Sequence, residues 1–403
     1  MTDTQQTTVV DTTTATTEDQ VITPWEVSSV GGVDYDKLVN QFGSTKIDDA
    51  LIARFEKVTG KKAHHFLRRG IFFSHRDLKE LLDHHESGKQ WFLYTGRGPS
   101  SGSLHFGHLL PFIFTKNLQD AFNVPLVIQM TNDEKFLWKG ITLDEAREYT
   151  FNNVKDIIAL GFDIQKTFIF SNLDYIQYLY PNALKISKCI TLNQIKGIFG
   201  FGDSDPCGKY NFPPVQAAPS FPDSFPHIFP PGSDYKNIRC LIPCAIDQDP
   251  YFRMTRDVAP KIGFQKPSLI HSKFFPALQG HNTKMSASDV NSAVYLSDTP
   301  DIVKDKIKKF AFSGGGATKE EQEKNGANLA VDVSYEYLTF LLEDDAKLKE
   351  IADAYGSGKM MTSQVKNILI DIMISTSQRH QEARAKITDD VLKAFMSIRK
   401  LNF

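Results

Sequence analysis

The sequence predicts an α/β protein, with a Rossmann-like domain built on a parallel sheet and an all-helical domain after it. Three apolar runs read as buried strands, and each is followed by a helical pattern: Trp91–Tyr94, Val124–Met130 and Ile238–Ile246. From about Asp301 onward the chain has helical patterns with caps. A length of 403 residues allows two or three such domains.

The first strand leads into a turn rich in small residues. Gly96 to Gly102 follows the strand, Ser103 is an expected N-cap, and residues 105–122 have helical spacing. Backbone N–H groups and the helix dipole meet at such a strand, loop and helix start, where they favour an anion such as phosphate.

Two histidines, His105 and His108, fall on one face of this helix start. Gly107 between them lacks the side chain that would keep a flat base or a ribose away. The turn by itself leaves two interpretations open, because Gly-rich turns with hydrogen-bonded buried histidines are common.

Polar residues follow the other two strands where those strands end. Gln129 closes the second strand and Glu134 with Lys135 comes next, while Asp247 and Gln248 follow the third strand. Ligands of open α/β sheets bind at the carboxyl ends of strands. A glutamate and a lysine in a loop are by default a surface pair, but in a cleft a carboxylate suits an α-ammonium group.

The regions outside this core have distinct compositions. Residues 1–20 are Thr-rich and nearly devoid of apolar side chains, which predicts a disordered tail. Residues 21–85 predict a hairpin that turns at Gly31-Gly32 and a helix from the cap Asp48 to Gly60. Within 86–300, the inserted region 144–234 predicts helices at 144–160 and 181–196, and its proline-rich part, 211–232, predicts no regular element.

Net charge, cysteine spacing and hydropathy argue against a generally basic nucleic-acid-binding protein, a zinc protein and a membrane or secreted protein. The net charge of −2 predicts that any nucleic-acid contact comes from a local patch. Four cysteines without a C-x-x-C pair predict buried free thiols and no bound metal. The chain lacks a long apolar run and a signal segment, so we expect a soluble intracellular protein.

Two motifs, His-Phe-Gly-His at 105–108 and Lys-Met-Ser-Ala-Ser at 284–288, resemble the signatures of class I aminoacyl-tRNA synthetases. The segments around them narrow the resemblance to the tryptophanyl family of the eukaryotic cytoplasmic type: YTGRGPSSGSLHFGHLLPFIFTK, VIQMTNDEKFLWK, VQAAPSF and CAIDQDPYFRMTRDVAP. This resemblance extends from about residue 23 to the C-terminus. It implies a cytoplasmic enzyme that activates L-tryptophan with ATP to tryptophanyl-adenylate and pyrophosphate, and then transfers tryptophan to the 3′ end of tRNA(Trp).

The resemblance implies a role for each site residue. Mg²⁺ is expected to arrive with the phosphates of ATP rather than in a protein cage. Lys284, His105, His108 and Arg97 would be catalytic, and the ATP contacts would come from Gly96, Gly98, His105, Gly107, His108, Asp247, Lys284, Met285 and Ser286.

The chemistry of the tryptophan side chain determines what its binding pocket must offer. Indole offers one donor, so its pocket needs an apolar slot that ends in an acceptor. The family uses Tyr94 and Gln129 for this, with Glu134, Gln216 and Gln248 at the ammonium and carboxylate end.

The sequence departs from the general class I pattern at Ala287, where many members carry a second lysine. We expect Arg97 to supply the missing positive charge. The family also implies a lid over the site that includes Trp25, a homodimer formed through the region 144–234 and an anticodon-binding domain at 301–403. Two basic stretches are either solvated surfaces or tRNA contacts: His64, His65, Arg68 and Arg69; and Arg379, His380, Arg384 and Lys386.

Three alternatives stay open at this point. A tyrosyl-tRNA synthetase shares the fold and both motifs but needs groups that pair with a phenolic hydroxyl. A small-molecule nucleotidyltransferase of similar fold seldom needs such a large helical domain. A catalytically silent synthetase-like binding protein would not require the intact signature residues.

Overall fold

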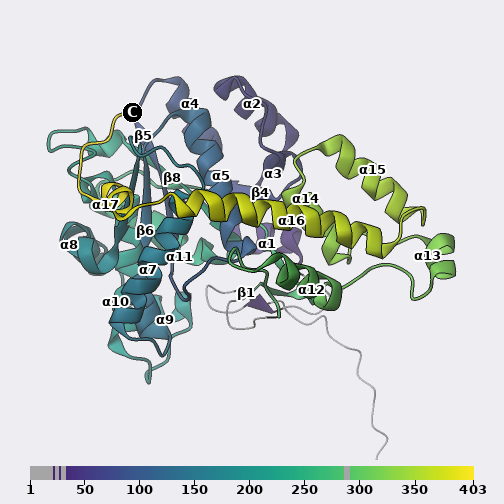
Figure 1. Ribbon diagram of the computed structural model, residues 1–403. Helices are drawn as coiled ribbons and strands as arrows, with labels where there is room; N and C mark the ends of the chain where they lie inside the picture. Colours follow the sequence, from purple (N-terminus) through teal and green to yellow (C-terminus); the bar gives the residue numbers. More distant parts are fainter. Residues whose placement is uncertain (1–20, 23–26, 29–32, 286–290) are drawn as a thin grey trace, which may run out of the picture.

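The computed structural model describes residues 21–22, 27–28, 33–285 and 291–403 (Figure 1). The predicted tail 1–20, Trp25 and Ser286 lie outside the described residues. For Lys284 only the backbone is described.

A seven-stranded sheet forms the centre of the molecule, with the strand order β3-β4-β9-β8-β5-β6-β7. The strands from β9 to β7 are parallel, and β4 and β3 add an antiparallel edge. The predicted α/β class is therefore confirmed. The strands are β3 Thr45–Lys46, β4 Phe72–Arg76, β5 Trp91–Arg97, β6 Leu126–Met130, β7 Thr167–Ser171, β8 Arg239–Ala245 and β9 Ser268–Ser272.

Each face of the sheet packs into its own hydrophobic cluster because side chains alternate along the strands. On β5, Trp91 and Leu93 join the cluster with α5 (Phe106–Phe122), α4 (Leu78–Glu86) and the C-terminal helices. Phe92 and Tyr94 join the opposite cluster with α8 (Asn172–Cys189), α9 (Leu192–Phe199), α10 (Cys207–Ala217) and α11 (Asp249–Val258). Consecutive residues of one buried strand thus pack against helices on opposite faces of the sheet.

The chain reverses its direction of winding at β5. The next strand in the sequence, β6, lies on one side of β5, and β8 lies on the other side. The carboxyl ends of β5 and β8 therefore open at a topological switch point, where α/β sheets bind ligands.

The loop that joins β5 to α5 begins and ends later in the chain than the sequence predicted. β5 continues to Arg97, so Gly96 and Arg97 belong to the strand and not to the turn. Helix α5 has its N-cap at His105 instead of Ser103. The pairing of β5 with β6 persists up to Arg97 and Met130, and this pairing keeps the strand extended.

The N-terminal extension packs beside β4 and β9. It contains β1 (Val21–Ile22), β2 (Val27–Ser28), α1 (Tyr35–Phe42), α2 (Asp49–Thr59) and α3 (His65–Arg68). The predicted hairpin is confirmed, but Ile22 pairs with Val27, so its connection precedes Gly31-Gly32. Asp48 caps α2 by accepting from the Leu51 N–H, as predicted.

The inserted region is more helical than predicted. It follows α6 (Asn132–Trp138) and contains α7 (Leu143–Ile158), α8 (Asn172–Cys189), α9 (Leu192–Phe199) and α10 (Cys207–Ala217). The helix predicted at 181–196 is two helices, with Thr191 capping the second. The prediction of no regular element in 211–232 is wrong for its start, because α10 runs through Pro213 and Pro214.

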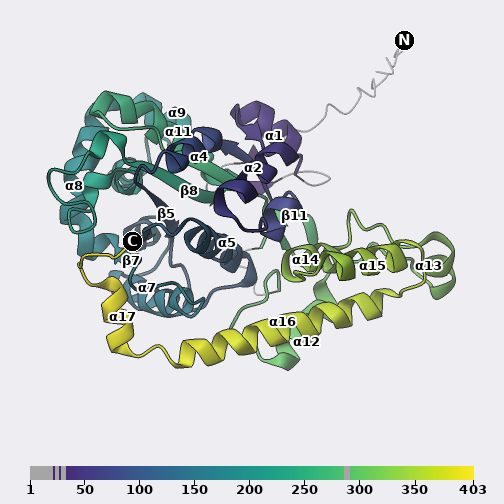
Figure 2. The same cartoon turned by 90° about the horizontal axis from the view of Figure 1, so that it is seen from above.

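The C-terminal part is helical, as predicted, and its last helix returns to the sheet. Helix α16 runs along the molecule toward α7, and α17 packs beside β7 and α7 (Figure 2). Thr388 caps α17 through its side chain. The helices are α12 Pro300–Phe310, α13 Lys319–Asn325, α14 Val333–Leu341, α15 Asp345–Gly356, α16 Thr362–Ala385 and α17 Asp389–Met396.

Two further observations concern composition. Cys240 and Cys244 are buried free thiols, as predicted, whereas Cys207 is exposed and Cys189 is half-buried. Among the described helices, none is both long and apolar enough to cross a membrane.

Candidate active site

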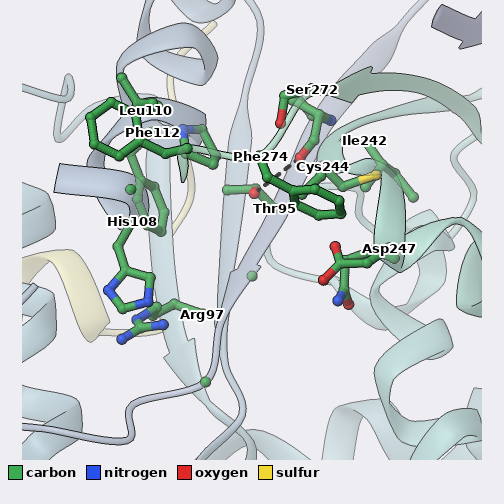
Figure 3. Close-up of a pocket in the computed structure, with 18 of the residues that line it drawn as sticks. Thr95, Arg97, His108, Leu110, Phe112, Ile242, Cys244, Asp247, Ser272 and Phe274 are labelled. Atoms are coloured by element: carbon green, nitrogen blue, oxygen red, sulfur yellow. Dashed lines mark hydrogen bonds between the residues drawn. The ribbon is translucent and has the colours of Figure 1, made fainter. Parts of the chain in front are cut away.

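A cavity of about 330 Å³ opens at the carboxyl ends of β5 and β8 (Figure 3). It brings together every predicted site residue whose side chain or glycine backbone the structure describes. Those lining residues are Tyr94, Gly96, Arg97, Gly98, His105, Gly107, His108, Gln129, Glu134, Gln216, Asp247, Gln248 and Met285.

The two signature histidines stack at one side of the cleft, with ring centroids 3.4 Å apart. His105 is buried, and within the described chain neither of its ring nitrogens has a hydrogen-bond partner. Burial, with a smaller contribution from the charge of Arg97, lowers the pKa of His105 to about 3. A neutral His105 can therefore donate one hydrogen bond and accept another.

Arg97 lies beside His108, across the cleft from Asp247 (Figure 3). Its Nε donates to Asn153 Oδ1 on α7 at 3.1 Å, while its Nη2 is buried and has no partner among the described residues. Burial lowers the pKa of Arg97 to about 10, so the guanidinium stays charged at neutral pH. A buried cation with a vacant donor favours an anion such as phosphate.

Two glycines let this part of the site pack closely. A Cβ on Gly98 would overlap Lys135 Cε and lie 2.7 Å from Glu134 Oε2. A Cβ on Gly107 would lie 3.2 Å from the His105 ring and 3.3 Å from Phe275 Cβ. The space beside Gly107, expected from the sequence to admit a base or ribose, is thus close to protein atoms.

Helices α10 and α8 complete the wall around Tyr94. The Tyr94 hydroxyl lies 2.5 Å from Gln129 Oε1 and 2.8 Å from the carbonyl oxygen of Gln216, and it can donate to either. Gln129 Nε2 donates to Asn172 Oδ1 at 2.8 Å, which fixes the amide with its oxygen toward Tyr94. Burial raises the pKa of Tyr94 well above its usual value, so the hydroxyl remains protonated.

Two residues of the site, Asn172 and Asn153, were not predicted from the sequence. They orient Gln129 and Arg97. Asn172 directly follows β7, and a polar residue at a strand's carboxyl end was a usable signal. Asn153 lies inside a helical pattern, so nothing local distinguishes it.

Glu134 is a buried member of the cleft and not a surface residue. Its Oε2 accepts from Thr131 Oγ1 at 2.7 Å, and its Oε1 accepts from Lys135 Nζ at 2.6 Å. The default interpretation of Glu134 and Lys135 as an exposed pair is therefore wrong. Inside the cleft the Glu134 carboxylate therefore has a cation and a hydroxyl group as its partners.

A buried network fixes the turn that carries Asp247 and Gln248. The next residue, Asp249, starts α11 (Asp249–Val258) and accepts from Arg76 Nε at 2.8 Å. Its Oδ1 also lies 3.1 Å from His271 Nε2. Although burial opposes ionisation, these two partners hold the pKa of Asp249 at about 2.

The segment that leads into the second signature forms a short hairpin beside the cleft. Strand β10 (Pro276–Ala277) pairs with β11 (Gly280–Lys284), placing the backbone of Lys284 opposite Pro276. The Met285 N–H donates to the Phe275 carbonyl oxygen at 3.1 Å, and the Met285 side chain is buried. The Lys284 side chain and Ser286 lie outside the described part of the chain.

Most of the side chains in the two predicted basic stretches pair with other residues of the protein. Arg68 and Arg69 pair with Asp345 at the start of α15, and Arg69 also donates to the carbonyl oxygens of Thr339 and Leu342. These residues join the N-terminal extension to the helical domain, so the interpretation as a solvated surface is wrong for the two arginines, whereas their contact with tRNA stays a prediction.

In the second stretch, His380 and Arg384 contact Asp156 of α7. Arg379 and Lys386 are exposed and remain possible sites of phosphate contact.

No group of three or more His, Cys, Asp or Glu side chains suited to a metal ion occurs among the described residues.

Comparison with models of protein families shows to which family the chain belongs. The model of the class I tRNA synthetases for tryptophan and tyrosine (W and Y) matches residues 86–377. The chain belongs to this family. As a class I synthetase it uses ATP as a substrate.

Similar proteins extend the match over nearly the whole synthetase. The cytoplasmic tryptophan–tRNA ligase of Dictyostelium discoideum is 78% identical over 394 residues, which are 97% of this chain and 98% of the relative. The cytoplasmic enzyme of Homo sapiens is 60% identical over 96% of this chain and 82% of its own length. A product-bound parasite tRNA synthetase matches with a TM-score of 0.88 and 50% identity, over 91% of this chain and 97% of the other.

A further solved structure of similar fold contains an amino-acid ligand. The tryptophanyl-tRNA synthetase of Encephalitozoon cuniculi, solved bound to tryptophan, matches with a TM-score of 0.83 and 45% identity. It covers 91% of this chain and 98% of its own.

Proposed function

We propose that this chain is a tryptophan–tRNA ligase that activates L-tryptophan with ATP and then esterifies tRNA(Trp). The observation that carries the proposal is the buried Tyr94–Gln129 pair, whose oxygens form a hydrogen-bonded end to a slot in the cleft. The resemblance to tryptophan–tRNA ligases, at up to 78% identity, supports the same substrate. Following the names of these relatives, we place the protein in the cytoplasm.

We propose that indole enters between β5 and α10 with its N–H toward this pair. The hydroxyl of Tyr94 uses its single hydrogen toward Gln129 or Gln216, so it keeps a lone pair for the indole donor. Phenylalanine would leave these buried polar groups without a partner, which is a strong basis for discrimination. A tyrosine side chain would bring a phenolic hydroxyl in place of the N–H.

The polar end of the amino acid would face Glu134, Gln216 and Gln248. All three line the cleft, and Glu134, which is paired with Lys135, offers a carboxylate to an α-ammonium group. Glutamines are neutral, so they orient the substrate carboxylate without quenching its nucleophilicity. That carboxylate then attacks the α-phosphate of ATP, and no protein base is required.

The protein's contribution to this step is alignment and positive charge. His105, His108 and Arg97 would hold the phosphates with backbone N–H groups near Gly96, Gly98 and Gly107. Asp247 would accept from the ribose hydroxyls on the opposite side. Mg²⁺ is part of the substrate here, carried by the phosphate oxygens.

The segment Lys284, Met285 and Ser286 would close on the leaving pyrophosphate. The pairing of β11 with β10 ends at Lys284, directly before Met285, which lines the cleft. A charge contact made in the transition state is worth about 2.7–4 kcal/mol by analogy with oxyanion donors. Trp25 would cover the site from the N-terminal hairpin.

A homodimer is part of the proposal. Helix α8 exposes Ile176, Tyr180 and Leu184 at successive four-residue steps, and Leu192 at the start of α9 is exposed as well. Such a contiguous apolar surface is typical of an interface. It lies in the predicted dimerisation region 144–234. The helical domain 301–403 would bind the tRNA anticodon.

The test is amino-acid-dependent ATP–pyrophosphate exchange, run in parallel with tryptophan, tyrosine and phenylalanine. We expect exchange with tryptophan alone, and a loss of about 10²- to 10³-fold in kcat for Lys284→Ala. A preference for tyrosine would overturn the pocket assignment and leave the family intact. No exchange with any amino acid would favour the binding-protein alternative.

A further inference from the structure

The last turns of α16 reach across to the catalytic domain at two points. Arg384 Nε donates to Asp156 Oδ1 on α7 at 2.6 Å, and His380 Nε2 lies 2.9 Å from the backbone oxygen of Asp156. One residue after His380, the side chain of Gln381 donates to the carbonyl oxygen of Leu296 at 2.6 Å.

At both contact points a further hydrogen bond leads to Leu104, the residue that precedes His105. Asp156 Oδ2 accepts from the Leu104 N–H at 3.3 Å. The Leu296 N–H donates to the Leu104 carbonyl oxygen at 2.9 Å. Leu104 therefore has both of its backbone groups held by partners that α16 contacts, and His105 follows it directly.

Breaking the contact between Asp156 and Arg384 would cost free energy, because the Asp156 carboxylate is buried. The Asp156 side chain is only 3% exposed, whereas that of Arg384 is 34% exposed. Burial raises the pKa of Asp156, and the charges of Arg384 and His380 oppose that rise. Without Arg384 the carboxylate would be buried without its cation, and it would protonate or move away from Leu104.

The same helix α7 also fixes Arg97. Asn153, one turn before Asp156, accepts from Arg97 Nε and donates to the Ser101 carbonyl oxygen at 2.8 Å. The loop between β5 and α5 is thus held along one face of α7. Arg384 braces that face from the helical domain.

We infer that Arg384 and Asp156 are positioning residues for ATP, which hold the signature loop from the C-terminal helical domain. Neither residue lines the cleft, so they act through Leu104 and His105. This inference rests on the proposed function. It gives Arg384 a role in amino-acid activation, a step that requires no tRNA.

The tryptophan end of the cleft has separate supports. Tyr94 and Gln129 are held by Gln216 and Asn172, which belong to α10 and α8 on the other face of the sheet. Loss of Arg384 should therefore weaken the use of ATP and leave the use of tryptophan unchanged. A general loss of stability would not produce this split.

The experiment is pyrophosphate exchange by the full chain, with KM measured separately for ATP and for tryptophan. For Arg384→Ala we expect about a tenfold rise in KM for ATP and no change in KM for tryptophan. The matched control is Lys155→Ala. Lys155 neighbours Asp156 on α7, and its Nζ lies 3.0 Å from Asp389 on α17, so it joins α7 to a C-terminal helix without contacting the loop.

A folded Arg384→Ala protein with an unchanged KM for ATP would overturn the inference. So would an equal rise in KM for ATP in Lys155→Ala, because loosening of the junction would then explain the effect. If Arg384→Ala does not fold, Arg384→Met keeps the packing of the stem and removes the charge, and a wild-type KM for ATP would again be contrary. Absence of exchange in the wild-type protein would instead refute the proposed function.

Discussion

Arg97 carries its charge inside the protein, with one guanidinium nitrogen bonded to Asn153 and another, Nη2, lacking a partner among the described residues. Its pKa of about 10 keeps it protonated at neutral pH. Its neighbour His105, with a pKa of about 3, is neutral there. One fixed cation beside a neutral donor and acceptor is an arrangement suited to phosphate oxygens.

We expect Arg97→Ala to slow adenylate formation by about 10²- to 10³-fold, because a charge contact to the phosphates is lost in the transition state. Tryptophan affinity should be nearly unchanged, because Arg97 lies at the proposed ATP end of the cleft. Single-turnover adenylate formation and equilibrium tryptophan binding measure the two quantities. The reverse pattern, weak tryptophan binding with a normal rate, would show that Arg97 does not serve the phosphates.

Helix α8 illustrates how one element serves two surfaces. Its inner face contributes Tyr175, Leu179 and Ile186 to the hydrophobic cluster behind β5. Its outer face exposes Ile176, Tyr180 and Leu184. Because 3.6 residues complete a turn, these two sets follow from a single helical pattern.

The outer face of α8 predicts the behaviour of Leu184→Asp. A carboxylate in an apolar interface lacks a partner, so the Kd of the proposed homodimer should rise at least tenfold. Analytical ultracentrifugation measures the change. The control is Ile302→Asp on α12, which is also an exposed apolar residue, 43% exposed, but lies outside the proposed interface. If both variants retained the wild-type mass, α8 would not be the interface.

At the scale of the whole molecule, a small number of charged contacts join parts distant in sequence. Arg69 from the N-terminal extension pairs with Asp345 and donates to three carbonyl oxygens of the helical domain. Arg384 braces α7 from the other end of that domain. Both arginines follow apolar or helical patterns that gave no indication of their partners.

We expect Arg69→Ala to lower the free energy of unfolding by about 1.5–3 kcal/mol, because partly buried carbonyl groups lose a charged donor. Scanning calorimetry would record a lower Tm. Arg54→Ala is the control, since Arg54 pairs with Asp83 and Glu86 on the surface and surface pairs contribute little. Equal effects in the two variants would contradict a special role for Arg69.

The sequence by itself determined features that depend on neighbours in the chain. The caps at Asp48 and Thr388 follow from side chains that reach an N–H three residues later. The strand, turn and helix around His105, and the polar residues that follow β6 and β8, fixed where the cleft would lie. A few residues of local pattern were enough for these predictions, because parallel strands bring their carboxyl ends together.

Only the tertiary structure decided which polar groups meet. Pro213 and Pro214 lie inside a helix because α10 is buried against α8, which outweighs the local preference against proline. Asn172 orients Gln129, and Arg384 holds Asp156, across long separations in sequence. A residue's type states that it needs a partner, but the fold alone selects that partner from many of equal chemistry.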